Sequence, residues 1–213
     1  MSANDTPEQQ NQNLLTRPFP EAVAYDLSAK DHTALIRVPP HSSWSSGLHW
    51  HDAHTEFLQV LRGRARVVVG GEEFVVGADA GGGGGVGIGV GIGGGDGDGG
   101  DVITVPRGVV HEWRRADEDG EGLVVREWTE PRDGGKEVFF RNLNALVLGS
   151  GGGGGGGVWG GMKLQVELWN LFWRADNYPV VWGSGIFGGV ATRAVMGIAV
   201  VVGWVLGCKG VYL

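Results

Sequence analysis

Short runs of β-type residues, each closed by a turn signal, fill the middle of this chain and constrain its fold most strongly. Such runs favour strands, and a glycine pair such as Gly70-Gly71 is typical of a two-residue hairpin turn. Because no long helical period separates the runs, we expect an antiparallel sandwich or barrel. The predicted strands are Thr33–Val38, Gly47–His51, Glu56–Leu61, Arg64–Val69, Glu73–Val76, Asp101–Val105, His111–Arg115 and Leu123–Thr129.

Glycine divides the chain into segments. Of its 213 residues 42 are glycine, and residues 81–100 hold 14 of these and residues 149–161 hold 10. The first window interrupts the β region and is expected to be an inserted loop, because the cost of closing a loop grows slowly with its length. The second is expected to be a flexible linker. The predicted segments are a disordered arm (1–21), a β domain (22–148), the linker (149–161) and a hydrophobic helical tail (162–213).

Charge and cysteine content exclude several classes of protein. The formal net charge is −7, which argues against a nucleic-acid partner, because binding to nucleic-acid phosphates requires clustered lysine and arginine side chains. The polar N-terminal segment has no apolar stretch of the signal-peptide type, and Cys208 is the single cysteine, so no internal disulfide can form. We therefore expect a cytoplasmic protein that is not secreted and has no nucleic-acid partner.

The tail after the second glycine window is apolar and rich in tryptophan. Apolar residues at helical spacing predict a helix near its start: Met162, Val166, Trp169 and Trp173. Residues 194–206 then carry no charge, but as a helix they cover about 20 Å, short of the roughly 30 Å hydrocarbon core of a membrane. Spanning that core would place Arg193 inside the membrane, which is costly.

Three interpretations of this tail stay open. Residues 180–207 associate with a membrane, or they cover a hydrophobic face of the β domain or of a partner subunit, or they form a degenerate C-terminus. The spacing Gly203-x-x-x-Gly207 matches that of packed membrane helices, but in a glycine-rich chain this match is weak evidence.

Three histidines and a glutamate gather between His49 and Glu56. On a strand, His49 and His51 point to the same face, and a turn then lets Glu56 begin the next strand. Imidazoles with one carboxylate on an apolar wall suit a divalent transition metal. The only histidine further along the chain is His111, which follows the break at Pro106-Arg107-Gly108.

These residues resemble the two sequence motifs of the cupin superfamily. The first motif is G-x5-H-x-H-x3,4-E-x6-G, and the chain has His49-x-His51-x4-Glu56-x6-Gly63. The second is G-x5-P-x-G-x2-H-x3-N, and the chain has Gly100-x5-Pro106-x-Gly108-x2-His111. A lone H-x-H is weak evidence, whereas two ordered motifs in register are specific.

The resemblance implies an all-β fold, a small jelly-roll barrel, with a metal held by three histidines and one glutamate. The implied ligands are His49, His51, Glu56 and His111, and the implied metal is Fe, Mn, Ni or Zn. The chain departs from the motifs at Ser43 and Arg115, which are not ligand positions. Arg115 shares strand parity with His111, so it either holds an anionic group of a substrate or lies at the rim.

The resemblance leaves two kinds of function open. In the first, the metal serves an enzyme of the dioxygenase or isomerase type that acts on a small organic molecule. In the second, the domain binds or senses a small molecule without catalysis and is tethered to a membrane by its tail. Members of the family often form homodimers, so a homodimer is also expected. The sequence assigns no catalytic residue and no second cofactor.

Overall fold

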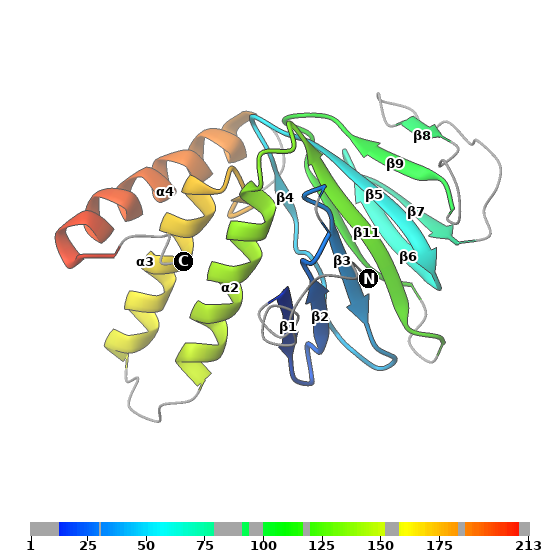
Figure 1. Cartoon of the computed structure of the whole chain (residues 1–213). Coiled ribbons are helices and arrows are strands. Elements are labelled where there is room, and N and C mark those ends of the chain that lie inside the picture. The colour runs from blue at the N-terminus through cyan, green and yellow to red at the C-terminus, as the bar shows by residue number, and fades with distance from the viewer. Residues whose placement is uncertain are drawn as a thin grey trace. The chain divides into compact units, whose positions relative to one another are not determined.

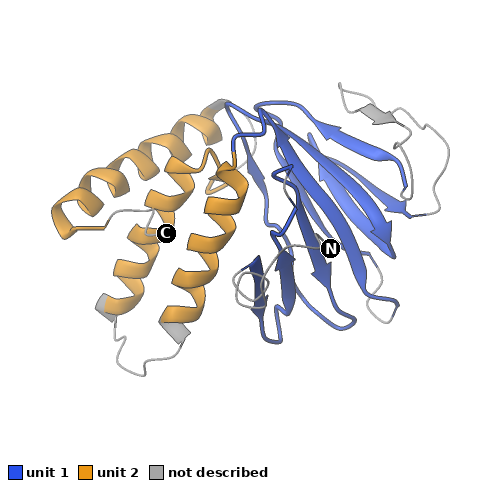
Figure 2. Ribbon diagram, in the orientation of Figure 1, with its two compact units in different colours: residues 1–133 blue, residues 134–213 orange. Residues whose placement is uncertain are grey.

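Two compact units make up the chain, residues 1–133 and residues 134–213, drawn in blue and orange in Figure 2. The computed structural model describes residues 13–29, 31–78, 91–93, 100–116, 120–151, 158–182 and 186–208. Most of the predicted arm and most of both glycine windows therefore lie outside the described residues.

The larger sheet of the first unit has seven antiparallel strands in the order β1-β2-β3-β11-β5-β9-β8 (Figure 1). They are β1 (Leu14–Arg17), β2 (Val23–Asp26), β3 (Ala34–Val38), β5 (Thr55–Arg62), β8 (Gly91–Gly93), β9 (Val102–Val105) and β11 (Leu123–Glu130). β5 and β11 are the longest and pair along their whole length, with Thr55 opposite Glu130 and Arg62 opposite Val124. This central pair sets the register of the sheet.

A second antiparallel sheet in the same unit holds four strands in the order β4-β10-β6-β7. They are β4 (His49–Trp50), β6 (Arg64–Val69), β7 (Glu72–Gly77) and β10 (His111–Arg115). β6 and β7 form the predicted hairpin, and both glycines of its turn, Gly70 and Gly71, have positive φ. β10 lies between β4 and β6, so His111 pairs with His49 on one side and with Val69 on the other.

The core of the first unit is built from residues that alternate along these strands. On β11 the buried positions are Leu123, Val125, Glu127 and Thr129, and the residues between them are half-buried or exposed. Apolar side chains from both sheets complete the core, including Ile36, Leu58, Val67, Ile103 and Trp113. Burial of each of these apolar side chains contributes about 1.5–3 kcal/mol. Because side chains alternate along a strand, polar residues at inward-facing positions, such as Glu127 on β11, are carried into the interior as well.

Gly63 joins β5 to β6 with a φ of +74°, and a Cβ atom there would lie 2.6 Å from the Gly122 carbonyl oxygen. We expect Gly63→Ala to cost at least about 2 kcal/mol and to lower the thermal midpoint by about 4–8 °C. Gly71→Ala is the matched control, because Gly71 also has positive φ but has open space around its Cβ position. Equal losses in the two variants, measured by thermal unfolding, would contradict this role of the Gly122 contact.

The second unit contains three helices and a two-residue strand. They are α2 (Gly135–Gly151), α3 (Val158–Arg174), β12 (Tyr178–Pro179) and α4 (Ile186–Leu206). α3 packs against both α2 and α4. α3 contains the predicted helical stripe, but the side chains it buries fully are Asn170 and Leu171. By length and composition alone, Phe187–Leu206 of α4 could cross a membrane.

The structure corrects parts of the sequence prediction. All eight predicted strands are present within two residues of their expected bounds, but the chain is not purely β. The predicted β domain ran to residue 148, whereas the first unit ends at Asp133 and α2 follows it. Leu14–Arg17 of the predicted arm form β1, because they pair with β2 in a regular antiparallel register.

Candidate metal centre

The two histidine-bearing motifs, far apart in sequence, meet inside the first unit. Glu56 on β5 pairs with Val105, the last residue of β9, which Pro106 follows. The turn that begins at Pro106 contacts the first motif directly, because the Gly108 N–H donates to the His51 carbonyl oxygen at 2.7 Å. Gly108 has a φ of +75°, a conformation that glycine adopts without strain. The second motif thus fixes the backbone of the first.

His49 and His111 are cross-strand partners on β4 and β10. Their ring centroids lie 4.2 Å apart, and the ring of His51 lies 5.1 Å from His49 and 5.5 Å from His111. All three side chains are buried. The pairing of β4 with β10 thus brings His49 and His111 together, with His51 beside them, and these are three of the four ligands that the family resemblance implied.

Glu56 enters the cluster from the opposite sheet and is 1% exposed. Its two carboxylate oxygens contact different histidines. Oε2 lies 3.0 Å from His51 Nε2, and Oε1 lies 3.1 Å from His111 Nε2. The carboxylate thus spans two imidazoles and faces their Nε2 atoms.

Backbone carbonyls fix the orientation of two of the rings. His49 Nδ1 lies 2.7 Å from the Gly47 carbonyl oxygen, and His111 Nδ1 lies 3.0 Å from that of Val109. A carbonyl oxygen only accepts, so each Nδ1 carries a proton that it donates. In the neutral ring each Nε2 then keeps a lone pair, the tautomer of an imidazole that ligates a metal through Nε2.

The electrostatics of the cluster favour a cation at its centre. Burial, together with the neighbouring His111 and His51, lowers the pKa of His49 well below its usual range. His49 is therefore neutral at pH 7 and can offer its lone pair without losing a proton first. A divalent cation between these imidazoles would also compensate the charge of the buried Glu56 carboxylate.

The four side chains fit a transition metal. The four candidate ligand atoms, one from each side chain, all lie within 4.8 Å of one another. With metal–ligand bonds of about 2.0–2.2 Å, two ligand atoms can be at most roughly 4.4 Å apart, so shifts of a few tenths of an ångström suffice. Three nitrogens and one carboxylate suit Mn, Fe, Ni or Zn better than Ca or Mg, which prefer oxygen ligands alone.

Comparison with known families agrees with this geometry. Residues 34–80 match the family model of the cupin domain. The chain contains a cupin domain. The matched residues include His49, His51 and Glu56 and end before His111, which the structure brings to the same cluster.

Similar solved structures include three proteins of low identity. A sugar phosphate isomerase of the cupin superfamily from Silicibacter pomeroyi is 16% identical, and the match covers 49% of this chain and 57% of that chain with a TM-score of 0.34. A predicted oxalate decarboxylase of Thermotoga maritima is 18% identical, and the match covers 50% of this chain and 77% of that chain with a TM-score of 0.35. A variant of the Bacillus subtilis oxalate decarboxylase is 19% identical, and the match covers 60% of this chain and 31% of that chain with a TM-score of 0.35. The chain thus spans less than two thirds of two of these proteins. The search of curated proteins gave no match.

A second ring-to-carboxylate contact crosses the interior of the cupin domain two residues further along β10. Trp113 Nε1 donates to Glu127 Oε2 at 2.9 Å, and both side chains are buried. The Trp113 ring lies 4.8 Å from that of Trp44, whose Nε1 donates to the Tyr25 hydroxyl. Burial raises the pKa of Tyr25 to about 12, so this phenol stays neutral. The sequence analysis gave Glu127 no role, although it lies two and four residues after Val125 and Leu123 on the same strand and therefore faces inward with them.

Arg115 and the other three histidines of the chain do not belong to the cluster. Arg115 is four residues beyond His111, about 13 Å along an extended strand, and is not among the four clustered side chains. His54 pairs with Asp133 at 3.1 Å. His32 and His41 have φ values of 57° and 62°, typical of turns, and neither belongs to the metal-ligand group.

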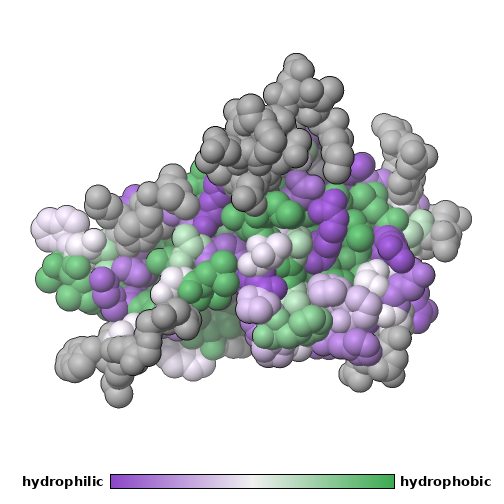
Figure 3. Space-filling model, turned by 60° about the horizontal axis from the view of Figure 1, so that its bottom comes forward, coloured by the Kyte–Doolittle hydropathy of each residue, from purple (hydrophilic) through white to green (hydrophobic). Residues whose placement is uncertain are grey.

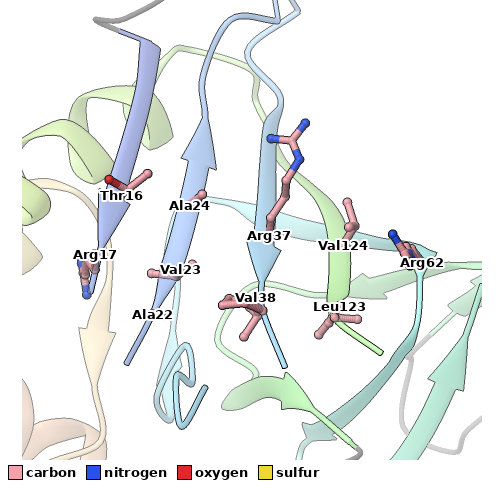
Figure 4. Close-up of a pocket in the computed structure, with 12 residues that line it drawn as sticks. Thr16, Arg17, Ala22, Val23, Ala24, Arg37, Val38, Arg62, Leu123 and Val124 are labelled. Atoms are coloured by element: carbon pink, nitrogen blue, oxygen red, sulfur yellow. The ribbon is translucent and has the colours of Figure 1, made fainter. Parts of the chain in front are cut away.

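A pocket of about 310 Å³ lies elsewhere in the cupin domain, at the far end of β5 from Glu56 (Figure 4). Arg17, Arg37 and Arg62 line it together with small apolar residues. Arg37 and Arg62 each have an acidic partner at 3.3 Å, Asp26 and Glu121, and the Arg17 guanidinium lies 5.5 Å from the centre of the Tyr25 ring. An anionic ligand of Arg37 or Arg62 would have to displace these carboxylates, so the pocket is a weaker candidate than the histidine cluster.

Proposed function

We propose that the cupin domain binds one divalent transition metal and uses it to act on a small organic molecule. The proposed ligands are His49, His51, Glu56 and His111. The observation that carries the proposal is the preset orientation of the site: carbonyl oxygens hold the Nδ1 atoms of His49 and His111, which leaves the Nε2 atom of each ring to a metal, and that of His111 already faces the Glu56 carboxylate at 3.1 Å.

The proposed reaction is of the oxygenase or isomerase type. Four protein ligands leave one or two positions open on a six-coordinate metal. A metal with an open position supplies Lewis-acid chemistry at a carbonyl or enolate oxygen, or a place for dioxygen. His49 and His51, at 7% and 6% exposed, are the least buried ligands, so a small molecule would approach from their side. Glu56 and His111, at 1%, would hold the metal from the protein side.

Metal content is the first test. We expect the full-length protein, reconstituted separately with Fe(II), Mn(II), Ni(II) or Zn(II), to retain about one equivalent of at least one metal after desalting. Elemental analysis of the desalted protein measures it. Retention below about 0.2 equivalents for all four metals would refute the proposal.

Non-catalytic binding of a small molecule is the second candidate. It is favoured by the interior beside the cluster, where Glu127 is hydrogen-bonded to Trp113 and the raised pKa of Tyr25 removes it from proton transfer near neutral pH. Oxygen uptake and turnover by the metal-loaded protein across a panel of hydroxy acids, diketones and sugars distinguish the candidates. Thermal stabilisation by a panel member without turnover would favour binding or sensing.

A further inference from the structure

Helix α4 exposes a continuous apolar face along its whole length. The residues of this face, the α4 apolar face, recur at helical spacing: Phe187, Val190, Ala194, Ile198, Val201 and Val205. Phe187 is 93% exposed and Val205 is 73% exposed. Hydrophobic surface is visible in green at the end of the molecule where α4 ends (Figure 3). Contiguous apolar surface of this kind often marks a site of interaction with another protein or a membrane.

The opposite face of α4 is already occupied by α3. Asn170 of α3 donates through Nδ2 to the Ala199 carbonyl oxygen at 3.0 Å, a bond between the two helices. Gly203 packs so closely on Asn170 that a Cβ atom would overlap its side chain. Thr192 and Met196, on the same side of α4, are fully buried. α4 is therefore held by α3 on one side and open on the other.

The partner helix α3 is unsuited to a hydrocarbon environment. It carries Lys163, which is exposed and forms an ion pair with Glu167. The two helices run antiparallel, because Glu167 lies near Cys208 at the end of α4 while Tyr178, just after α3, contacts Arg193 near its beginning. If α4 crossed a membrane with α3 alongside, the charges of α3 would enter the bilayer at a cost of several kcal/mol.

Polar and aromatic groups flank the α4 apolar face where a membrane interface would need them. The Arg193 guanidinium turns back towards Gly189 and lies 5.6 Å from the centre of the Tyr178 ring. The Tyr178 ring contacts that of Trp173. Trp182 before the helix and Trp204 near its end are 65% and 82% exposed. Tyrosine, tryptophan and arginine are the residues that anchor a helix at the headgroup level.

The size of the face argues against a second copy of the chain as its partner. A 21-residue helix is about 31 Å long and about 10 Å wide, so one face offers roughly 300 Å². A stable dimer buries about 800 Å² on each subunit. Lipid can cover a single helical face, and Arg193 complements anionic headgroups.

We propose that α4 lies along the surface of a phospholipid bilayer, with the α4 apolar face among the acyl chains and α3 on the water side. The helix axis is parallel to the membrane plane. Arg193 and Trp204, beside the face, lie at the headgroup level. This attachment is independent of the metal centre and would place the cupin domain at a membrane surface.

Vesicle flotation of the full-length protein tests the attachment. We expect the protein to float with vesicles of phosphatidylcholine and phosphatidylglycerol. The double variant Ile198→Glu/Val201→Glu is expected to bind at least about tenfold more weakly, because each substitution replaces an exposed apolar side chain that the bilayer would bury. Val75→Glu is the matched control, since Val75 is an exposed valine of β7 outside α4, and it should float like the wild type. Thermal unfolding checks that each variant folds.

A separate variant tests the proposed contact between Arg193 and the lipid headgroups. Arg193→Gln should weaken binding to vesicles with phosphatidylglycerol about fivefold and leave binding to pure phosphatidylcholine unchanged. Equal flotation of the wild type and the double variant would overturn the proposal. Absence of flotation, with a dimer in solution that the double variant dissociates, would also overturn it in favour of a second copy.

Depth measurements test the orientation of the helix. Cys208 is the single cysteine, so Cys208→Ser provides a background for spin labels at Val190→Cys, Ile198→Cys and Val205→Cys. A helix in the membrane plane puts all three labels at similar depth, about 5–10 Å below the headgroups. A central label some 10 Å deeper than the two outer ones would show a crossing helix and overturn the orientation.

Discussion

Replacing Glu56 with glutamine will lower the metal affinity of the protein by at least about a hundredfold. Glu56 is the only carboxylate among the four clustered side chains, and its oxygens contact both His51 and His111. Glutamine keeps the size of the side chain but removes its negative charge and presents an amide group to one of the two imidazoles. Competition with a chelator of known affinity measures the change. The thermal stabilisation that metal gives the wild type should disappear in the variant.

Glu127→Gln is the matched control for this experiment. Glu127 is also a buried glutamate of the larger sheet, and its partner is Trp113 rather than an imidazole of the cluster. The amide oxygen of glutamine can still accept the hydrogen bond from Trp113, so we expect full metal content. Retention of metal by Glu56→Gln, or equal loss in both variants, would show that the cluster is not the metal site.

Part of the site could be predicted from the sequence because its geometry is local. His49 and His51 share one face of a strand by parity, and Glu56 follows across a short turn. His111 was assigned through the family resemblance, since the pairing of β10 with β4 is a long-range contact that sequence spacing alone does not determine. The strands themselves were predictable because β-type runs alternate with glycine and proline breaks.

The contacts that support the site could not be derived in the same way. The hydrogen bond between Trp113 and Glu127 joins opposite sheets, and that between Trp44 and Tyr25 joins residues 19 apart in sequence. α2 was missed although Pro131 and Gly134-Gly135 separate it from β11, because a short apolar run such as Val138-Phe139-Phe140 suits a strand as well as a helix. The position of α4 on α3 depends on the fit of Asn170 to Gly203, which no composition reveals.

Removing the Trp113 ring will destabilise the cupin domain more than any surface substitution. Trp113 is 1% exposed, packs on Trp44 and donates a hydrogen bond to the buried Glu127. Trp113→Ala leaves a cavity, which costs about 3–5 kcal/mol, and removes the hydrogen bond to the buried Glu127 carboxylate, which adds about 1–3 kcal/mol. Trp113→Phe keeps most of the ring and loses the donor, so we expect an intermediate loss, as measured by chemical denaturation.

Trp128→Ala is the control that shows whether the loss of stability is specific to Trp113 or follows the removal of any tryptophan. Trp128 is half-buried and stacks on Phe57 at 5.3 Å, so its removal opens no closed cavity and should cost clearly less than Trp113→Ala. Metal content distinguishes stability from site chemistry, because Trp113→Phe leaves all four proposed ligands in place and should keep its metal. Loss of metal from Trp113→Phe at a temperature where it is folded would mean that the Trp113–Glu127 contact positions His111.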